Sequence, residues 1–151
     1  MIKVFAMRGL LLFFLLSLTP FDACAKPANH DVEDLGAVAG AVLACGAYKP
    51  LYQFEEILSR YFANTSANDV EEEALLRRYA SSKANTFKLM RRRRNDDCGS
   101  TVSEFSRSKF FSFELYSDGS LRDLNGKFIY PRGRKGLSKD AQKIYPAPRK
   151  R

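Results

Sequence analysis

The amino-acid sequence predicts an α+β protein that is mostly α: a disulfide-linked three-helix unit followed by a small antiparallel β-hairpin and a basic tail. Three observations lead to this fold class. Apolar residues recur at three- and four-residue steps over much of residues 31–97, which is the spacing of one helix face. The pattern alternates over 110–116, as in a strand with one buried face, and residues 121–151 are rich in basic side chains.

The beginning of the chain has the three parts of a secretory signal peptide. Two basic residues precede an apolar run over 10–18, and Ala23-Cys24-Ala25 is a small-residue cleavage pattern. Cleavage after Ala25 places Lys26 at the mature N-terminus. The apolar run is about half of the roughly 20 residues that a membrane-spanning helix needs, so we expect no transmembrane span after signal removal.

Cys24 raises an alternative, in which a lipid-modified cysteine becomes the new N-terminus. Asp22 lies where that processing requires a small or apolar residue, so cleavage after Ala25 is the preferred interpretation. The chain then divides into a signal peptide (1–25), a helical domain with a C-terminal β-hairpin (26–130) and a basic, flexible tail (131–151).

The three helices are predicted in order from their boundary residues. Asp31 caps the first, which runs to Gly46, a residue typical of a helix C-terminus. Pro50 lies in the first turn of the second, where a missing N–H does no harm. Asn68 caps the third, with Glu71 as its reciprocal capping partner.

The third helix is expected to continue to about Asp97. Gly99 ends it, or Val102 and Phe105 extend it by two further turns; the pattern leaves both open.

A strand is expected from residue 110, with Phe111, Phe113 and Leu115 on its buried face. Asp118-Gly119 and Asn125-Gly126 are two-residue hairpin signals. We therefore predict a hairpin or a three-stranded meander over 110–130, followed by an extended tail.

Two cysteines remain after signal removal, at the ends of the first and third predicted helices. An exported protein meets oxidising conditions, so Cys45 and Cys98 are expected to form a structural disulfide. Closing a loop of this length stabilises a chain by up to about 4 kcal/mol. The alternative, a redox-active pair, lacks the C-x-x-C spacing that lowers a thiol pKa.

The segment Leu43-Ala44-Cys45-Gly46, followed some fifty residues later by a second cysteine on an arginine-bearing helix, resembles small two-cysteine exported helical proteins of alphaproteobacteria. The resemblance covers residues 31–105. It implies an exported compartment and a helical fold, and no activity.

The charge is concentrated near the C-terminus. The whole chain has a net charge of +8, and residues 121–151 contain ten basic residues against two acidic ones. Such asymmetry predicts contact with something anionic. For an exported protein the candidates are acidic glycans such as lipopolysaccharide, phospholipid head groups or an acidic protein, with nucleic acid a weaker candidate. A solvated tail that only aids solubility is the alternative.

Nine basic residues are candidates for one anion-binding surface, because arginine binds phosphate and carboxylate bidentately. They are Arg91, Arg92, Arg93, Arg94, Arg122, Lys127, Arg132, Arg134 and Lys135. The first four also fit a charged, solvated helix end. Tyr116 and Tyr130 would add an aromatic component that suits sugars or phosphates if they lie on the outer face of the hairpin; packing in the core is the alternative.

The sequence offers little for catalysis. Its one histidine, His30, lies in the predicted N-terminal lead-in, and no nucleotide-binding or hydrolase motif is present. We expect no metal and no cofactor. A carboxylate pair remains formally possible. The available acids are Glu55, Glu56, Glu71, Glu72, Glu73, Asp96, Asp97 and Glu114.

The leading hypothesis is an exported, non-enzymatic binding protein whose basic surface contacts an anionic cell-envelope component or an acidic protein partner. The alternatives are a secreted effector that engages a host molecule, and a small carboxylate-based hydrolase. Asn64-Thr65-Ser66 also matches the N-glycosylation pattern, which matters only in a eukaryotic secretory pathway.

Overall fold

The structure is a computed structural model that describes residues 29–92 and 97–145. The helices of this part are α1 (Asn29–Ala44), α2 (Tyr48–Thr65), α3 (Asp69–Arg92), α4 (Cys98–Phe105) and the short 3-10 helix η1 (Lys109–Ser112). The strands are β1 (Glu114–Tyr116), β2 (Leu121–Arg122), β3 (Phe128–Ile129) and β4 (Lys143–Tyr145). Helices followed by a small antiparallel sheet confirm the predicted fold class.

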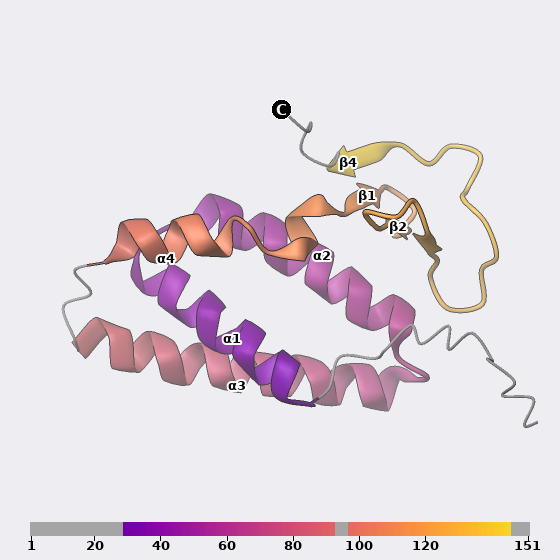
Figure 1. The fold of residues 1–151 in the computed structure, drawn as a ribbon. Helices are drawn as coiled ribbons and strands as arrows, with labels where there is room; N and C mark the ends of the chain where they lie inside the picture. The colour runs from indigo at the N-terminus through magenta and orange to yellow at the C-terminus, as the bar shows by residue number, and fades with distance from the viewer. Residues whose placement is uncertain (1–28, 93–96, 146–151) are drawn as a thin grey trace, which may run out of the picture.

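The helices pack around α1, and the sheet lies at one end of α2 (Figure 1). α3 runs along one side of α1, while α2 and α4 cover other parts of it. The sheet order is β3-β2-β1-β4, with every neighbouring pair antiparallel. The sheet contacts the helices through α2.

The contact between α1 and α3 depends on two glycines of α1. A Cβ at Gly36 would lie 2.5 Å from the carbonyl oxygen of Tyr79, and a Cβ at Gly40 would lie 2.9 Å from the Cβ of Thr86. Real Cβ atoms do not approach other atoms so closely. The two helix backbones can therefore be this near to one another only because both positions lack a side chain.

The predicted end of the first helix and the predicted start of the second are confirmed, but the predicted start of the first is wrong. α1 begins at Asn29, so Asp31 lies within its first turn and does not cap it, and His30 belongs to the helix. α1 ends at Ala44, and Gly46 follows with a φ of +73°, a conformation that glycine adopts without a steric penalty. α2 begins at Tyr48, so Pro50 lies in its first turn. The buried face of α2 is the predicted apolar one.

The cap of α3 is also confirmed, with one difference. The Glu71 N–H donates to Oδ1 of Asn68 at 2.9 Å, as expected. The Glu71 carboxylate accepts a hydrogen bond from the N–H of Ala67. The capping pattern predicts that this carboxylate accepts from the N–H of Asn68, and its observed donor is the N–H one residue earlier.

The expectation that the third helix continues to Asp97 and ends at Cys98 is wrong. α3 ends at Arg92, and Cys98 is the first residue of a separate helix, α4. Asp97 is the N-cap of this helix, because its side chain accepts a hydrogen bond from the N–H of Ser100. An aspartate that caps the next helix cannot also continue the previous one. Residues 93–96 lie outside the described part.

The predicted disulfide joins the end of α1 to the start of α4. The Cα atoms of Cys45 and Cys98 are 5.5 Å apart. The bond closes a loop that contains all of α2 and α3, since the two cysteines are 53 positions apart. It therefore holds α4 against the end of α1.

Aromatic side chains form the centre of the core. The ring of Phe54 on α2 lies 4.9 Å from that of Phe105 on α4 and 5.5 Å from that of Phe110 on η1. Phe111 also contacts Phe54 and Phe105, at 6.0 and 5.2 Å. Tilted and edge-to-face pairs at these distances are favourable beyond the area that they bury.

This core explains why the predicted strand begins later than residue 110. Phe110 and Phe111 are consecutive, yet both rings contact Phe54. Consecutive side chains of a strand point to opposite faces, so a strand could not place both rings there. The chain forms the 3-10 turn η1 instead, and β1 starts at Glu114.

Both predicted hairpin turns are present. Gly119 and Gly126 have φ of +82° and +80°, and they connect β1 to β2 and β2 to β3. The prediction of an extended tail from residue 131 is wrong for its last described part. Lys143–Tyr145 forms β4 on the edge of β1, and the Ser117 N–H donates to the carbonyl of Gln142 at 2.8 Å.

The sheet is attached to α2 by a side chain that sequence patterns did not single out for this role. The Asn64 amide nitrogen donates to the carbonyl oxygens of Gly119 and Ile129, at 2.9 and 3.1 Å. One amide therefore satisfies carbonyls of two neighbouring parts of the sheet. Because this nitrogen is the atom that a glycan would occupy, the contacts argue against glycosylation of Asn64 in the folded chain.

The glycine contact gives a first prediction. Gly40→Ala should lower the free energy of unfolding by about 1–3 kcal/mol, because the added methyl overpacks the α1–α3 interface. Gly99→Ala is the matched control, since a Cβ there meets nothing within 4 Å. It should leave the stability unchanged or raise it by up to about 1 kcal/mol through helix propensity. Urea denaturation followed by circular dichroism measures both; equal effects would contradict the glycine argument.

The disulfide gives a second prediction. Replacing Cys45 and Cys98 together by serine should lower the free energy of unfolding by about 2–5 kcal/mol, because the unfolded chain regains the freedom of the open loop. Urea denaturation of this variant should agree with that of the parent protein under reducing conditions. A loss below about 1 kcal/mol would show that the helices hold α4 in place without the bond.

Candidate functional site

Charged and aromatic side chains gather on the outer face of the sheet. We use this name for the side chains of Glu114, Tyr116, Arg122, Phe128, Tyr130 and Lys143. Directly paired residues of antiparallel strands point to the same side, and the register pairs Glu114 with Arg122 and Arg122 with Phe128. The opposite side, with Leu115 and Leu121, packs on the core.

Three aromatic rings lie in a row on the outer face. The ring of Tyr116 is 5.8 Å from that of Phe128, and Phe128 stacks on Tyr130 with parallel planes 5.6 Å apart between centroids. The Arg122 guanidinium lies over Phe128 at 5.5 Å, the distance of a cation–π contact. The sequence pointed to Tyr116 and Tyr130, and it missed Phe128, which connects them.

Tyr116 does not have the exposure that the predicted aromatic patch requires. It is only 8% exposed, and its hydroxyl donates to the Glu114 carboxylate at 2.9 Å. Tyr116 is therefore buried and packs against the ring of Phe128, as the core-packing alternative expected. Phe128 and Tyr130 are partly exposed and form the accessible aromatic part.

Glu114 is the electrostatic centre of the outer face. Its carboxylate accepts a hydrogen bond from Nζ of Lys143 at 2.7 Å and forms a longer ion pair with Arg122 at 3.4 Å. The Lys143 ammonium lowers the Glu114 pKa; burial opposes this, and Tyr116 and Arg122 lower the pKa further, so the net shift is downward. Glu114 is thus a carboxylate at neutral pH.

Two further predicted anion-binding arginines are engaged by carboxylates of the same chain. Arg132 binds Asp69 and Glu72 at the N-terminus of α3, at 2.5 and 2.7 Å. Arg134 forms a longer ion pair with Asp118, at 3.4 Å. These arginines hold the segment after β3 to α3 and to the β1–β2 turn.

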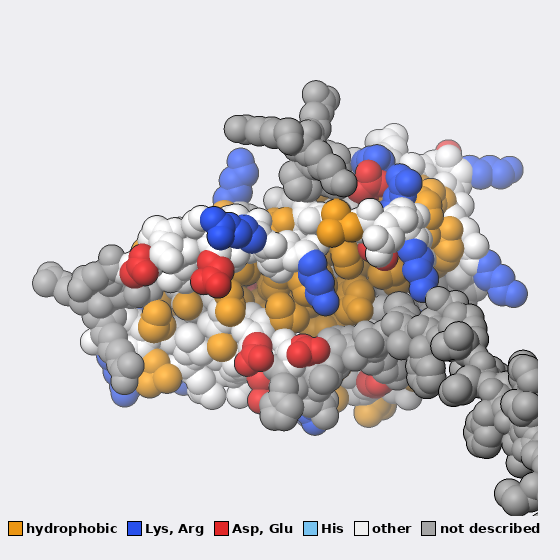
Figure 2. Space-filling model, in the orientation of Figure 1, with side chains coloured by type: hydrophobic (Ala, Val, Ile, Leu, Met, Phe, Trp, Pro, Cys, Tyr) orange, Lys and Arg blue, Asp and Glu red, His pale blue; other side chains and the backbone are white. Residues whose placement is uncertain are grey.

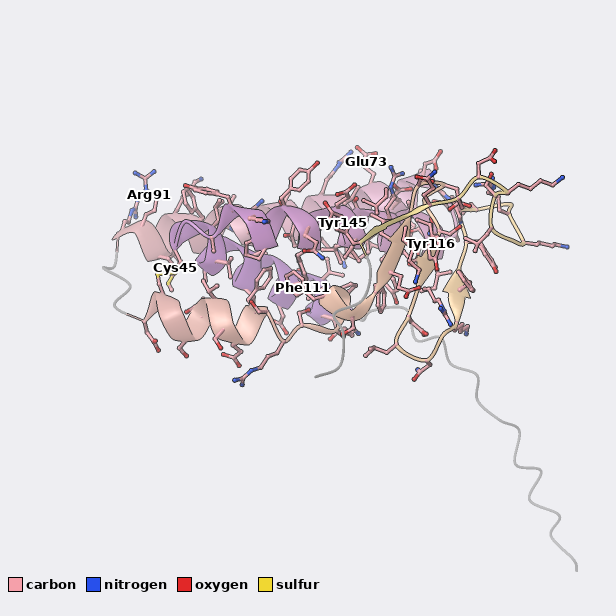
Figure 3. All side chains as sticks on the ribbon, turned by 90° about the horizontal axis from the view of Figure 1, so that it is seen from above. Cys45, Glu73, Arg91, Phe111, Tyr116 and Tyr145 are labelled. Carbon is pink, nitrogen blue, oxygen red and sulfur yellow. A yellow bond between two sulfur atoms is a disulfide. The ribbon has the colours of Figure 1, made fainter. Side chains whose placement is uncertain are left out.

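The structure separates cations that the sequence analysis grouped as one anion-binding surface, and anion binding itself stays a prediction. Arg91 and Arg92 lie in the last turn of α3, whereas Arg132 contacts Asp69 in its first turn. At 1.5 Å per residue the two ends of this helix are about 33 Å apart. Figure 3 shows Arg91 at the same end of the molecule as Cys45, whereas Tyr116 lies toward the other end. Arg93 and Arg94 lie outside the described residues.

The cations near the sheet are therefore less available than the sequence suggests. Several lysine and arginine side chains lie at the sheet end of the molecule on the face shown in Figure 2. Arg122, Arg132 and Arg134 each form an ion pair with a carboxylate of the chain. The side chains of Lys127, Lys135 and Lys139 form no ion pair with any described residue. An anionic ligand could reach these three lysines without breaking an ion pair to a described residue.

Each described carboxylate that the sequence analysis considered for catalysis accepts a hydrogen bond or forms an ion pair within the chain. Glu55 accepts hydrogen bonds from Tyr79 and Lys83, and Glu56 accepts one from Tyr145. The hydrogen bond to Glu56 raises the pKa of Tyr145 to about 12, and burial adds to this shift. Burial is the main cause that raises the pKa of Tyr79, and the hydrogen bond to Glu55 raises it further. Glu73 pairs with Arg77, and Asp96 lies outside the described residues.

Comparison with known proteins adds no assignment: the chain matches no protein-family model, no curated protein and no solved structure. The likeness to two-cysteine proteins of alphaproteobacteria stays a prediction. Within residues 29–92 and 97–145, no helix is both long and apolar enough to cross a membrane. The same residues contain no group of three or more side chains that could hold a metal ion.

The outer face gives a pH-dependent prediction. Glu114→Gln should lower the free energy of unfolding by about 1 kcal/mol at pH 7, because Lys143 and Arg122 lose their shared charge and both are partly exposed. A carboxylate whose pKa is lowered on folding stabilises the fold above its unfolded pKa of about 4.3, and the gain is lost as the pH falls through the folded pKa.

Urea denaturation between pH 7 and pH 3 measures this effect. The difference between parent and variant should persist from pH 7 to about pH 5 and shrink below about pH 4. Glu73→Gln is the control, because it removes an exposed helix ion pair that contributes only about 0.2–0.5 kcal/mol. A difference that grows toward acid pH would contradict the direction of the Glu114 shift.

Proposed function

We propose that this protein is an exported, non-enzymatic binding protein whose sheet end contacts an acidic glycan of the cell envelope. The observation that carries the proposal is the outer face itself. It combines the partly exposed rings of Phe128 and Tyr130 with Arg122, which lies over Phe128. Aromatic surface beside cationic side chains suits sugar rings that carry carboxylate or phosphate.

Export is supported by two independent features. The first is the signal-peptide pattern in the sequence of residues 1–25. The second is the Cys45–Cys98 disulfide of the fold, because such bonds persist in oxidising compartments. A binding partner in the envelope is consistent with both.

The charge distribution favours the sheet end over the arginines of α3. Lys127, Lys135 and Lys139 lie close in sequence to the outer face and are free of ion pairs with described residues. Arg91 lies over the ring of Phe87 at 5.5 Å, in the last turn of α3 and away from the outer face. We therefore place ligand contact at the lysines and the outer face.

A binding role also fits the state of the carboxylates. A glycoside hydrolase needs a general acid whose pKa is raised. The two described carboxyl groups with a resolved shift, Glu114 and Asp118, both have lowered pKa values. For Asp118, burial raises the pKa, and hydrogen bonds from the Ser138 and Ser120 N–H groups outweigh it.

The test compares two pairs of substitutions that remove the same charge at opposite ends of the molecule. Lys127→Gln with Lys135→Gln should weaken binding of the mature chain to purified lipopolysaccharide about tenfold at low salt, since two cation contacts of under 1 kcal/mol each are lost. Arg91→Gln with Arg92→Gln should change the Kd less than twofold. Isothermal titration calorimetry measures both.

Two further measurements identify the ligand class. Binding should weaken steeply with added salt, because exposed charges are screened. Tyr130→Ala should weaken binding to lipopolysaccharide and leave binding to phosphatidylglycerol vesicles unchanged, if a sugar ring lies against Tyr130. Equal losses in the two lysine and arginine pairs, or binding that survives high salt, would refute the proposal.

A further inference from the structure

An apolar groove lies between α1 and α4, on the face shown in Figure 2. It has a volume of about 380 Å³, and its apolar surface comes from Leu35, Val38, Ala41, Phe54 and Phe105. Val38 is 45% exposed although it lies on the face of α1 that contributes to the core. Hydrophobic side chains are visible along this groove in Figure 2, with acidic side chains on both sides of it.

The walls of the groove are acidic. Asp34 of α1 and Glu104 of α4 both line it, and neither forms an ion pair with any described residue. Two cations, Arg107 and Lys109, flank Ser108 at one end of the groove, and Nζ of Lys109 lies over the ring of Phe110. An occupant should therefore carry compact apolar groups followed by positive charge.

The end of this chain has that chemistry. Residues 146–151 read Pro-Ala-Pro-Arg-Lys-Arg, and they lie outside the described part. Proline-rich segments favour an extended helix that loses little entropy on binding and fits grooves lined by aromatic rings. Proline also has no N–H, so Pro146 and Pro148 leave no unpaired donor on apolar surface.

We propose that residues 146–151 bind in this groove of the same chain. Pro146, Ala147 and Pro148 would cover the apolar surface at Leu35 and Val38. The basic residues that follow would then lie against Asp34 and Glu104. The groove is in this way an intramolecular site for a proline-rich basic segment.

The described chain ends beside α2, the helix whose Phe54 lines the groove. The Tyr145 hydroxyl donates to Glu56 of α2 at 2.8 Å, and Glu56 faces a different side of this helix from Phe54, so the segment would pass around α2 to reach the groove. Six extended residues span about 20 Å. In Figure 1 the arrow of β4 points from the sheet toward the part of the molecule that contains α4.

The experiment uses the full mature chain and three variants. The tail variant carries Arg149→Ser, Lys150→Ser and Arg151→Ser. The groove variant carries Asp34→Asn and Glu104→Gln, and both of these side chains are exposed, so the fold should tolerate the changes. The control carries Glu73→Gln and Asp140→Asn, which removes as much negative charge from exposed positions elsewhere.

Methyl resonances of Leu35 and Val38 report occupancy of the groove. They should shift in the tail variant, and the groove variant combined with the tail variant should show little additional shift, because the two changes remove one interaction. High salt should move the parent resonances in the same direction. Unchanged methyl resonances in the tail variant would overturn the proposal, and so would shifts that depend on protein concentration, which would assign the groove to a second copy.

Removal of C-terminal basic residues by carboxypeptidase B gives an independent readout. The groove variant should lose them about three- to tenfold faster than the parent, as expected for two exposed charge pairs. The control variant should differ from the parent by less than twofold. Equal rates in the parent and the groove variant would contradict docking of the tail.

Discussion

Gly36 and Gly40 bring the backbone of α1 against that of α3, and the rest of the helical arrangement follows from this approach. With α3 so close on one side, the remaining surface of α1 is left to α2 and α4. The disulfide then holds the start of α4 to the end of α1, so the aromatic rings of α2, α4 and η1 meet in one cluster. The groove lies between α1 and α4, and Phe54 and Phe105 of this cluster are among its lining residues.

Electrostatic contacts in this protein serve largely to close the chain on itself. Arg132 reaches carboxylates of α3 that precede it by about sixty residues, and Lys143 reaches Glu114 across the sheet. Among residues 121–145, the basic C-terminal region is therefore not a free cationic tail. Part of its positive charge is neutralised by acids that lie far away in the sequence, while Lys127, Lys135 and Lys139 form no ion pair with any described residue.

Features encoded by a few neighbouring residues could be predicted, and features that depend on distant ones could not. Gly46, the Asn68 cap and the two glycine turns carry their own conformational preference, so their positions were correct. η1 forms because two consecutive phenylalanines must reach Phe54, and β4 forms because β1 has an open edge. Neither requirement is visible until the fold brings the partners together. For the same reason the candidate cations were grouped as one surface, although the length of α3 separates Arg91 and Arg92 from Arg132.

β4 is the element that connects the two proposed surfaces. Lys143 belongs to the outer face and binds Glu114, whereas Tyr145, two residues later, contacts Glu56 on α2 at the start of the path to the groove. Deleting residues 132–151 would remove an edge strand, the Arg132 contacts and the proposed groove ligand together. A loss of binding after that deletion could not be assigned to any one of them. Single charges must therefore be changed within an intact β4, because only then do the outer face and the groove respond separately.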